Sequence, residues 1–167
     1  YFARMLVVGR HKHMKIGDEI IDVEEIIEDL EEESDLQGLE VVEWPQTLMI
    51  DGPVFVEVAE DELWLSPDGK TAFHQPVKEV NVSVWRTLEL ATVVSYDVKA
   101  LYHTLDTFGV AVHFYNVHDL RQGAFLIDPL ARDRSVATLI GTDATDMAII
   151  LAGSQVVYEA QKEQLAA

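Results

Sequence analysis

The amino-acid sequence predicts one mixed α/β domain, and three observations carry this fold class. The chain has 167 residues, 49% of them hydrophobic, so it is long enough to bury a core of its own. Residues 53–76 consist of β-rich runs joined by turn sequences, whereas helical and strand-like segments alternate after Pro76. Strands followed by such an alternation are typical of folds that pack helices on a mixed sheet.

The composition excludes several classes of protein. The chain has no cysteine, so disulfide scaffolds, thiolate metal clusters and cysteine nucleophiles are excluded. No apolar run approaches the roughly 20 residues of a membrane span, and no charged and then apolar leader opens the chain. We therefore expect a soluble cytoplasmic protein without a membrane partner. The first residue is Tyr1 and not Met, which is compatible with a piece of a longer protein.

The negative charge is concentrated in one part of the chain. The formal net charge is −18, and residues 16–69 contain nineteen Asp or Glu but no Lys or Arg. The remainder carries eleven acids and twelve bases, so it is close to neutral. Neither part offers the cluster of cations that drives counterion release from DNA. We therefore expect this segment alone to bind DNA weakly or not at all.

The N-terminal third predicts a strand and an acidic helix. Residues 2–8 form an apolar run that is compatible with a strand. Residues 17–35 read as an amphipathic helix, because apolar side chains recur at helical spacing from Ile16 to Leu30. Eleven acids in residues 18–35 leave disorder or a calcium site as alternatives. The calcium-loop pattern of alternating Asp or Asn with a central Gly is missing, which favours a solvated helix.

The clearest β signal follows. Residues 39–44 are a short strand candidate, and residues 53–59, 62–65 and 70–75 predict three strands of a meander with a turn at residues 66–69. After Pro76 the pattern predicts a helix or mixed segment at 77–90, strands at 91–95 and 110–114, and helices at 97–108, 118–127, 135–140 and 144–164.

Three segments resemble a known family. Residues 94–109, V-S-Y-D-V-K-A-L-Y-H-T-L-D-T-F-G, resemble the second motif of the 3′–5′ proofreading exonuclease domain of family A (DNA polymerase I type) polymerases. Residues 118–129, H-D-L-R-Q-G-A-F-L-I-D-P, resemble the helix that follows in that family, and residues 53–60, P-V-F-V-E-V-A-E, fall where its first strand carries D-x-E. The resemblance covers residues 52–165 and implies a ribonuclease H-like mixed sheet flanked by helices, with residues 52–167 as the exonuclease-like domain. The resemblance does not cover residues 1–51, which we expect to form an acidic extension of a strand and an amphipathic helix, with an insertion or a linker as alternatives.

The resemblance also implies that the exonuclease chemistry has been lost. Active members hold two divalent metals with four carboxylates. In this chain Val58 stands at the first Asp, Leu101 at the Asp of the second motif and Gly153 at the last Asp, and only Glu60 remains at the position of an acid. One carboxylate cannot hold two Mg²⁺ ions. We expect Val58, Leu101 and Gly153 to converge on one apolar hollow without a metal.

The other acids have ordinary structural explanations. Asp97 stands at the Asn of the second motif and is placed to cap the helix that follows it, and Asp119 also stands at a helix start, where a carboxylate is favourable. Glu60 is most simply a solvated strand end.

The leading hypothesis is therefore an inactive exonuclease-like domain without catalytic, metal or cofactor residues of its own. It would support a polymerase domain that follows Ala167, uses Mg²⁺ and dNTP, and contacts DNA, in the cytoplasm or the nucleoid. One alternative is an active nuclease whose altered site uses Glu60, Asp97 and Asp119. Another is a free-standing acidic module that docks on a basic partner.

Overall fold

The computed structural model describes residues 13–16, 19–22, 37–131, 134–140 and 146–166, and the chain divides into two compact units. The first unit is Tyr1–Gln37 and the second is Gly38–Ala167. Among the helices of these described ranges, none combines the length and the apolar character needed to cross a membrane.

The described part of the first unit is a two-stranded antiparallel sheet of β1 (His13–Ile16) and β2 (Glu19–Asp22). The helix predicted for residues 17–35 is therefore wrong at Glu19–Asp22. The two β-branched residues Ile20 and Ile21 suit a strand. The rest of the predicted helix, and the strand predicted for residues 2–8, lie outside the described residues.

The second unit is built on a six-stranded mixed sheet with the order β3-β6-β5-β4-β7-β8. β4, β5 and β6 form the predicted antiparallel meander, and β7 and β8 continue the sheet in parallel to β4. β3 pairs in parallel with β6 at the other edge. The strands are β3 (Glu40–Val41), β4 (Pro53–Ala59), β5 (Glu62–Ser66), β6 (Thr71–Pro76), β7 (Thr92–Ser95) and β8 (Asn116–Asp119).

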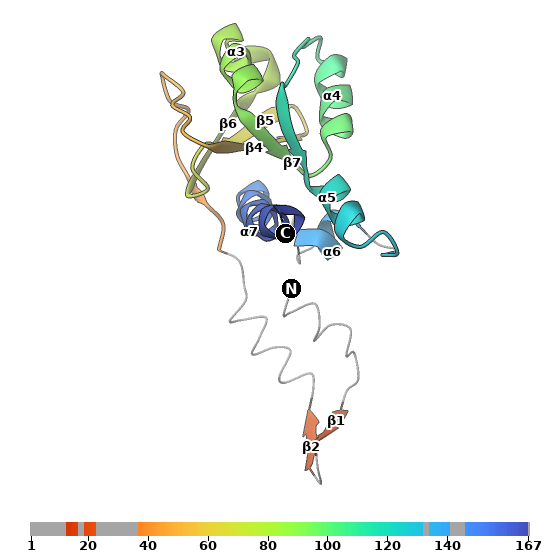
Figure 1. Cartoon of the computed structure of the whole chain (residues 1–167). Coiled ribbons are helices and arrows are strands. Elements are labelled where there is room, and N and C mark those ends of the chain that lie inside the picture. The colour runs from red at the N-terminus through yellow and green to blue at the C-terminus, as the bar shows by residue number, and fades with distance from the viewer. Residues whose placement is uncertain (1–12, 17–18, 23–36, 132–133, 141–145, 167) are drawn as a thin grey trace. The chain divides into compact units, whose positions relative to one another are not determined.

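Helices cover both faces of this sheet (Figure 1). α3 and α4 lie on one face, and α7 lies on the other with α5 and α6 beside it. The helical elements are the 3₁₀ turn η1 (Val77–Glu79) and the helices α3 (Val82–Leu90), α4 (Val98–Thr107), α5 (Leu120–Ile127), α6 (Val136–Ile140) and α7 (Met147–Ala166). The helices predicted after residue 80 are confirmed, with ends shifted by a few residues.

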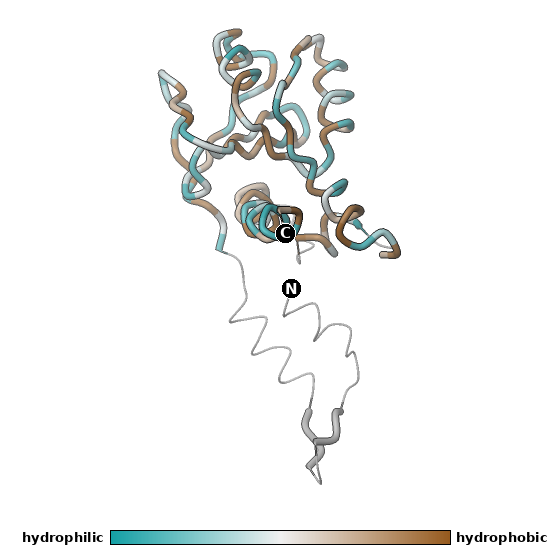
Figure 2. The backbone as a smooth tube through the Cα atoms, viewed as in Figure 1, coloured by the Kyte–Doolittle hydropathy of each residue, from teal (hydrophilic) through white to brown (hydrophobic). Residues whose placement is uncertain are grey.

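The core consists of two clusters, one on each face, because successive side chains of a strand point to opposite faces. On β4, Val54 and Val56 join the cluster under α3 and α4, whereas Phe55 joins the cluster under α7. Val93 and Val94 of β7 divide in the same way. The apolar character of the sheet is visible along its central strands in Figure 2.

The division between the units falls after Gln37, whereas the sequence analysis placed it after Asp51. The segment between these positions belongs to the second unit for two reasons. β3 is a strand of its sheet, and Trp44, Leu48 and Ile50 pack against its core. The Trp44 ring lies edge-on to the Phe73 ring with centroids 5.0 Å apart.

The strand predicted for residues 110–114 is also wrong, because the strand of this region is β8, which begins at Asn116. The preceding backbone bonds to side chains and a helix end instead of to a strand. The amide of Phe114 donates to the Tyr102 hydroxyl, and the amide of Tyr115 donates to the carbonyl of Glu89. The buried ring of Phe114 fixes this segment against the core.

Candidate functional site

The acidic residues of interest gather at the carboxyl ends of the parallel strands β4, β7 and β8. Glu57 lies near the end of β4, Asp97 follows β7, and Asp119 is the last residue of β8. Ser95 lies opposite Asp119 in the register of β7 and β8. This edge of an α/β sheet is where ligands most often bind, because loops and helix N-termini meet there.

Glu57 is a largely buried carboxyl group. Its Oε1 accepts a hydrogen bond from the Ser95 hydroxyl and another from the amide of Tyr96, at 2.9 Å. Burial raises the pKa of Glu57 to about 7, because the charged form loses its hydration. The hydrogen bonds from Ser95 and Tyr96 oppose this shift, and the negative charges of Asp119 and Asp97 add to it.

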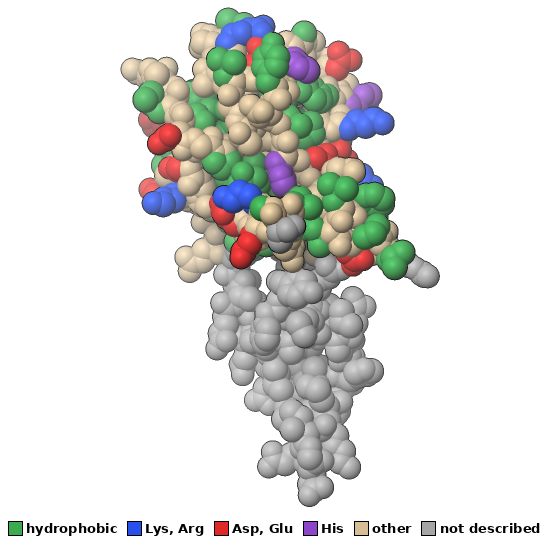
Figure 3. Space-filling model, in the orientation of Figure 1, with side chains coloured by type: hydrophobic (Ala, Val, Ile, Leu, Met, Phe, Trp, Pro, Cys, Tyr) green, Lys and Arg blue, Asp and Glu red, His purple; other side chains and the backbone are tan. Residues whose placement is uncertain are grey.

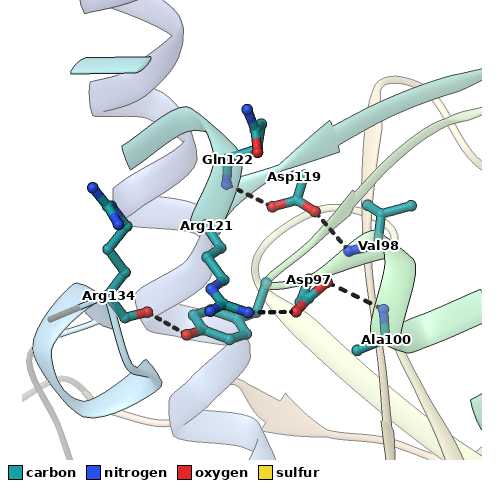
Figure 4. Close-up of polar contacts among 8 residues, drawn as sticks. Asp97, Val98, Ala100, Asp119, Arg121, Gln122 and Arg134 are labelled. Atoms are coloured by element: carbon teal, nitrogen blue, oxygen red, sulfur yellow. Dashed lines mark hydrogen bonds and ion pairs between the residues drawn. The ribbon is translucent and has the colours of Figure 1, made fainter. Parts of the chain in front are cut away.

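Asp119 joins the N-termini of two helices. Its Oδ1 accepts from the amide of Gln122 in α5 at 2.7 Å, and its Oδ2 accepts from the amide of Val98 in α4 at 2.8 Å. The first four amides of a helix have no partner within the helix, and the N-terminus carries partial positive charge. One carboxylate therefore satisfies amides of two helices and stabilises both ends (Figure 4).

Asp97 also holds local structure. Its Oδ1 accepts from the amide of Ala100 at 3.1 Å, which caps α4 as the sequence predicts. Its Oδ2 accepts from Nη1 of Arg121 at 3.0 Å, and Figure 4 shows the Arg121 side chain reaching from α5 to this carboxylate. The pair ties the first turn of α5 to the first turn of α4.

An open hollow of about 330 Å³ lies beside these acids. Its lining residues combine both signs of charge with one aromatic ring: Asp97, Lys99, Asp119, Arg121, Gln122, Phe125 and Arg134. The Arg134 guanidinium lies 4.9 Å from the centre of the Phe125 ring. The backbone carbonyl of Arg134 accepts a hydrogen bond from the Tyr96 hydroxyl. The hollow is thus built from the starts of α4 and α5 and the segment before α6.

These residues do not fit the two-metal site that the resemblance implies for active exonucleases. Each oxygen of Asp97 and Asp119 already accepts a hydrogen bond, and Glu57 with a pKa near 7 is about half protonated at neutral pH. Within the described ranges no three His, Cys, Asp or Glu side chains form a group that could hold a metal ion. The arrangement suits helix capping and ion pairing better than metal coordination.

The structure separates Glu60, the third acid that the sequence suggested for an active nuclease, from this site. Glu60 lies in the β4–β5 hairpin, is exposed, and has a positive φ of 57°. It does not line the hollow that Asp97 and Asp119 share. The set Glu60, Asp97 and Asp119 is therefore not gathered around that hollow.

The expectation that Val58, Leu101 and Gly153 converge is wrong. Val58 and Leu101 do belong to one cluster, under α3 and α4, because Val58 points to the same face as Val56. Gly153 is buried in α7, the helix that covers the opposite face of the sheet. The apolar character expected at the first two positions is present, but the third lies across the sheet.

Sequence reasoning missed Glu57. It named Glu60, three residues further along, because the resemblance aligned that residue with the family's Glu. The signal for Glu57 was available, since it is the single acid inside the otherwise apolar run of residues 54–59. An acid in the middle of a buried strand needs hydrogen-bond partners, and Ser95 and Tyr96 supply them.

Comparisons with known proteins show a likeness to solved structures. No protein-family model matches the chain, and no curated protein matches it. Among solved structures, it is similar to the chain described as the POL domain of Pol1 from M. smegmatis in complex with DNA primer-template and dNTP, with a TM-score of 0.54 and 14% sequence identity. The match covers 68% of this chain and 23% of that chain, so this chain spans less than a quarter of its length. The likeness shows that this chain shares a mixed α/β fold with part of that polymerase structure.

Proposed function

We propose that this chain contains the catalytically inactive 3′–5′ exonuclease-like domain of a DNA polymerase of the Pol I type, and that this domain supports the polymerase domain structurally. Three resembling segments in the family's order and the fold similarity to part of a Pol1 structure both support the proposal. The mixed sheet, with a meander on one side of β4 and two parallel strands on the other, is compatible with a ribonuclease H-like fold.

The observation that carries the proposed inactivity is that the carboxylates of the site accept hydrogen bonds from the protein itself. Asp97 and Asp119 hold the N-termini of α4 and α5, and Glu57 is bonded to Ser95 and Tyr96. Val58 and Leu101 pack in an apolar cluster at positions where active members carry acids. A two-metal nuclease needs several carboxylates whose oxygens are free for the ions.

The remaining parts of the proposal follow from the charge and periodicity of the N-terminal part and, for the polymerase domain, from the resemblance. The acidic N-terminal part is an extension of the exonuclease-like domain, and a polymerase domain follows Ala167 in the complete protein. That domain is the partner of this one, uses Mg²⁺ and dNTP, and provides the contact with DNA. The protein then works in the cytoplasm, at the nucleoid in a bacterium.

A nuclease assay tests the inactivity. The chain is incubated with single-stranded DNA labelled at its 3′ end and with Mg²⁺ or Mn²⁺, beside an Asp97→Ala/Asp119→Ala variant and an Asp106→Ala control on the exposed side of α4. We expect no release of 3′ nucleotides above background from any of the three proteins. Metal-dependent release that only the double variant loses would establish the active nuclease instead.

The coding sequence downstream of Ala167 tests the polymerase part separately. The proposal requires a polymerase domain there, whereas a free-standing acidic module requires none. An open reading frame that stops at Ala167 would overturn the structural-support role, whatever the nuclease assay gives.

A further inference from the structure

The chain contains two Asp-Gly pairs, Asp51-Gly52 and Asp68-Gly69, in opposite surroundings. An Asp-Gly pair can rearrange without a catalyst, because the glycine amide nitrogen can attack the side-chain carboxyl carbon of the aspartate and close a five-membered succinimide ring. Glycine favours this reaction, since it has no side chain to hinder the approach and its backbone rotates freely. The fold decides whether the nitrogen can come within about 3 to 3.5 Å of that carbon, the separation from which such attacks proceed.

The pair Asp68-Gly69 is held in place in the turn between β5 and β6. Oδ1 of Asp68 accepts from the amides of Lys70 and Thr71, each at 2.9 Å, and the Thr71 hydroxyl lies 3.1 Å from both carboxylate oxygens. The amide of Gly69, which would have to attack, donates to Oγ of Ser66 at 3.0 Å. Both reacting groups must therefore give up hydrogen bonds before a ring can close.

Two further properties of this turn oppose the reaction. Gly69 is buried and tightly packed, since a Cβ at this position would lie 2.3 Å from Nε2 of Gln155. Desolvation raises the pKa of Asp68, but the hydrogen bonds from the amides of Thr71 and Lys70 outweigh it and lower the pKa below its ordinary value of 3.8. Ring closure releases water from the protonated carboxyl group, so the lowered pKa keeps the reactive form scarce.

The pair Asp51-Gly52 has none of these restraints. Both residues are exposed, and they form a bend directly before β4. Among the described residues, neither the Asp51 carboxylate nor the Gly52 amide has a hydrogen-bond partner. A Cβ at Gly52 would meet nothing within 4 Å. The segment that leads into β4 runs along the margin of the second unit in Figure 1, and Figure 3 shows acidic side chains exposed on this margin.

We propose that Asp51 is a modification site, at which the folded protein forms isoaspartate. The amide nitrogen of Gly52 bonds to the side-chain carboxyl carbon of Asp51, and the carboxyl hydroxyl leaves as water together with the amide hydrogen. Water then opens the ring at either carbonyl. Opening at the former main-chain carbonyl leaves the backbone running through the side chain, which adds one carbon to the chain and frees an α-carboxylate. One water leaves and one returns, so no oxidant or cofactor is consumed.

The added carbon would fall between two anchored parts of the second unit. Ile50 packs against the core cluster under α3 and α4, and Pro53 begins β4 opposite Thr92 of β7. The bend between them therefore absorbs the change in chain path. The freed carboxylate would lie on the exposed bend, directly before a central strand of the sheet.

Ageing of the full chain at neutral pH tests the proposal without any substitution. After several weeks the protein is denatured and cleaved after glutamate, which places the two sites in separate peptides, residues 44–57 and 63–79. Electron-transfer fragmentation in a mass spectrometer distinguishes isoaspartate from aspartate in each peptide. We expect isoaspartate to accumulate several-fold faster at Asp51 than at Asp68.

The same chain aged in urea is the control for the local sequence. Both positions are Asp-Gly pairs, and the hydrogen bonds of the β5–β6 turn are lost on unfolding, so we expect similar rates at Asp51 and Asp68 there. Equal rates in the folded chain, or no isoaspartate at Asp51 above the starting level, would overturn the proposal. A preference for Asp51 that persists in urea would contradict it as well, because the neighbouring sequence and not the fold would then select the site.

Discussion

A single carboxylate, that of Asp119, fastens two helices to the edge of the sheet. It caps α5 through the amide of Gln122 and accepts from the amide of Val98 at the start of α4. Half of this role is predictable from residue type, because a carboxylate at a helix start is a familiar cap. The second half needs the register of β7 and β8, which brings residues 95 and 119 side by side.

We therefore predict that Asp119→Ala lowers the free energy of unfolding by about 2 kcal/mol or more, since one lost cap costs about 1 kcal/mol and two are lost here. Asp119→Asn keeps one acceptor oxygen and should lose roughly half as much. Asp106→Ala, at an exposed position of α4, is the matched control and should change stability little. Urea unfolding followed by circular dichroism measures all three, and equal stability of Asp119→Ala and the control would contradict the double cap.

Glu57 predicts a pH dependence whose sign is opposite to that of most acids. Its pKa is raised from 4.5 to about 7 in the folded protein, so the folded state holds a proton that the unfolded state has already released. The contribution of Glu57 to stability is therefore present below pH 4.5 and falls as the pH rises through 7. The loss is on the order of 3 kcal/mol between these limits.

Glu57→Gln tests this prediction, because a glutamine retains an oxygen for Ser95 and Tyr96 but does not titrate. Unfolding free energies of both proteins are measured from pH 4.5 to pH 8.5. We expect the difference in stability between the variant and the natural protein to shift in favour of the variant as the pH increases from 4.5 to about 7, and to level off above pH 7. A difference that stays constant over this range would show that Glu57 keeps an ordinary pKa.

At the scale of elements, α5 and α7 meet at a close contact between Gly123 and Gln161. A Cβ added at Gly123 would lie 2.3 Å from Oε1 of Gln161. Gln161 is only 3% exposed and cannot move freely, because it is bonded to the carbonyl of Leu120 and to the His118 ring, each at 2.8 Å. The absence of a side chain at residue 123 is what lets the two helices approach.

Gly123→Ala should accordingly destabilise the domain by about 1 to 3 kcal/mol, since Gln161 must give up buried hydrogen bonds. Gln161→Ala removes the obstacle, so the double variant should be less destabilised than the sum of the two single variants. Gln122→Ala, one residue earlier on the exposed side of α5, is the control for an added alanine in this helix. Strict additivity in chemical unfolding experiments would contradict the contact.

The elements that could be predicted from the sequence are those whose pattern is set by local rules. The meander at β4, β5 and β6 follows from β-rich runs and a turn sequence, and α4 and α7 follow from helical spacing. The strand predicted at residues 110–114 failed because the amides of His113 and Phe114 donate to the side chains of Glu89 and Tyr102, which are partners that no local pattern contains. The helix predicted at 17–35 failed at β2, where acids and paired isoleucines fit either period.

The candidate site could be predicted only in part, because a local sequence pattern does not contain the contacts between distant segments. Asp97 and Asp119 stand at helix starts that the sequence identifies, so their capping role could be expected. Their joint placement with Glu57 depends on the parallel pairing of β4, β7 and β8. Gly153 was assigned by resemblance to the same hollow as Val58, and the alternation of faces along β4 with the position of α7 decides against this.

At the scale of the whole molecule, the second unit should fold without the first. Among the described residues, the members of both core clusters lie between Leu39 and Tyr158. Residues 38–51 contribute β3 and the partly buried side chains of Trp44, Leu48 and Ile50. The position of the cut therefore decides the outcome of a truncation.

We predict that a chain of residues 38–167 unfolds cooperatively with nearly the stability that the second unit has in the longer chain. A chain of residues 52–167 should be less stable by on the order of 3 to 5 kcal/mol, because each buried apolar side chain that is lost contributes about 1.5 to 3 kcal/mol and these three are partly buried. Tryptophan fluorescence and circular dichroism during urea unfolding compare the chains, with the variant Trp44→Ala in residues 38–167 to isolate the contact with Phe73. Equal stability of the two truncated chains would place the domain boundary after Asp51, as the sequence alone suggested, and would mean that β3 and Trp44 add nothing to the fold.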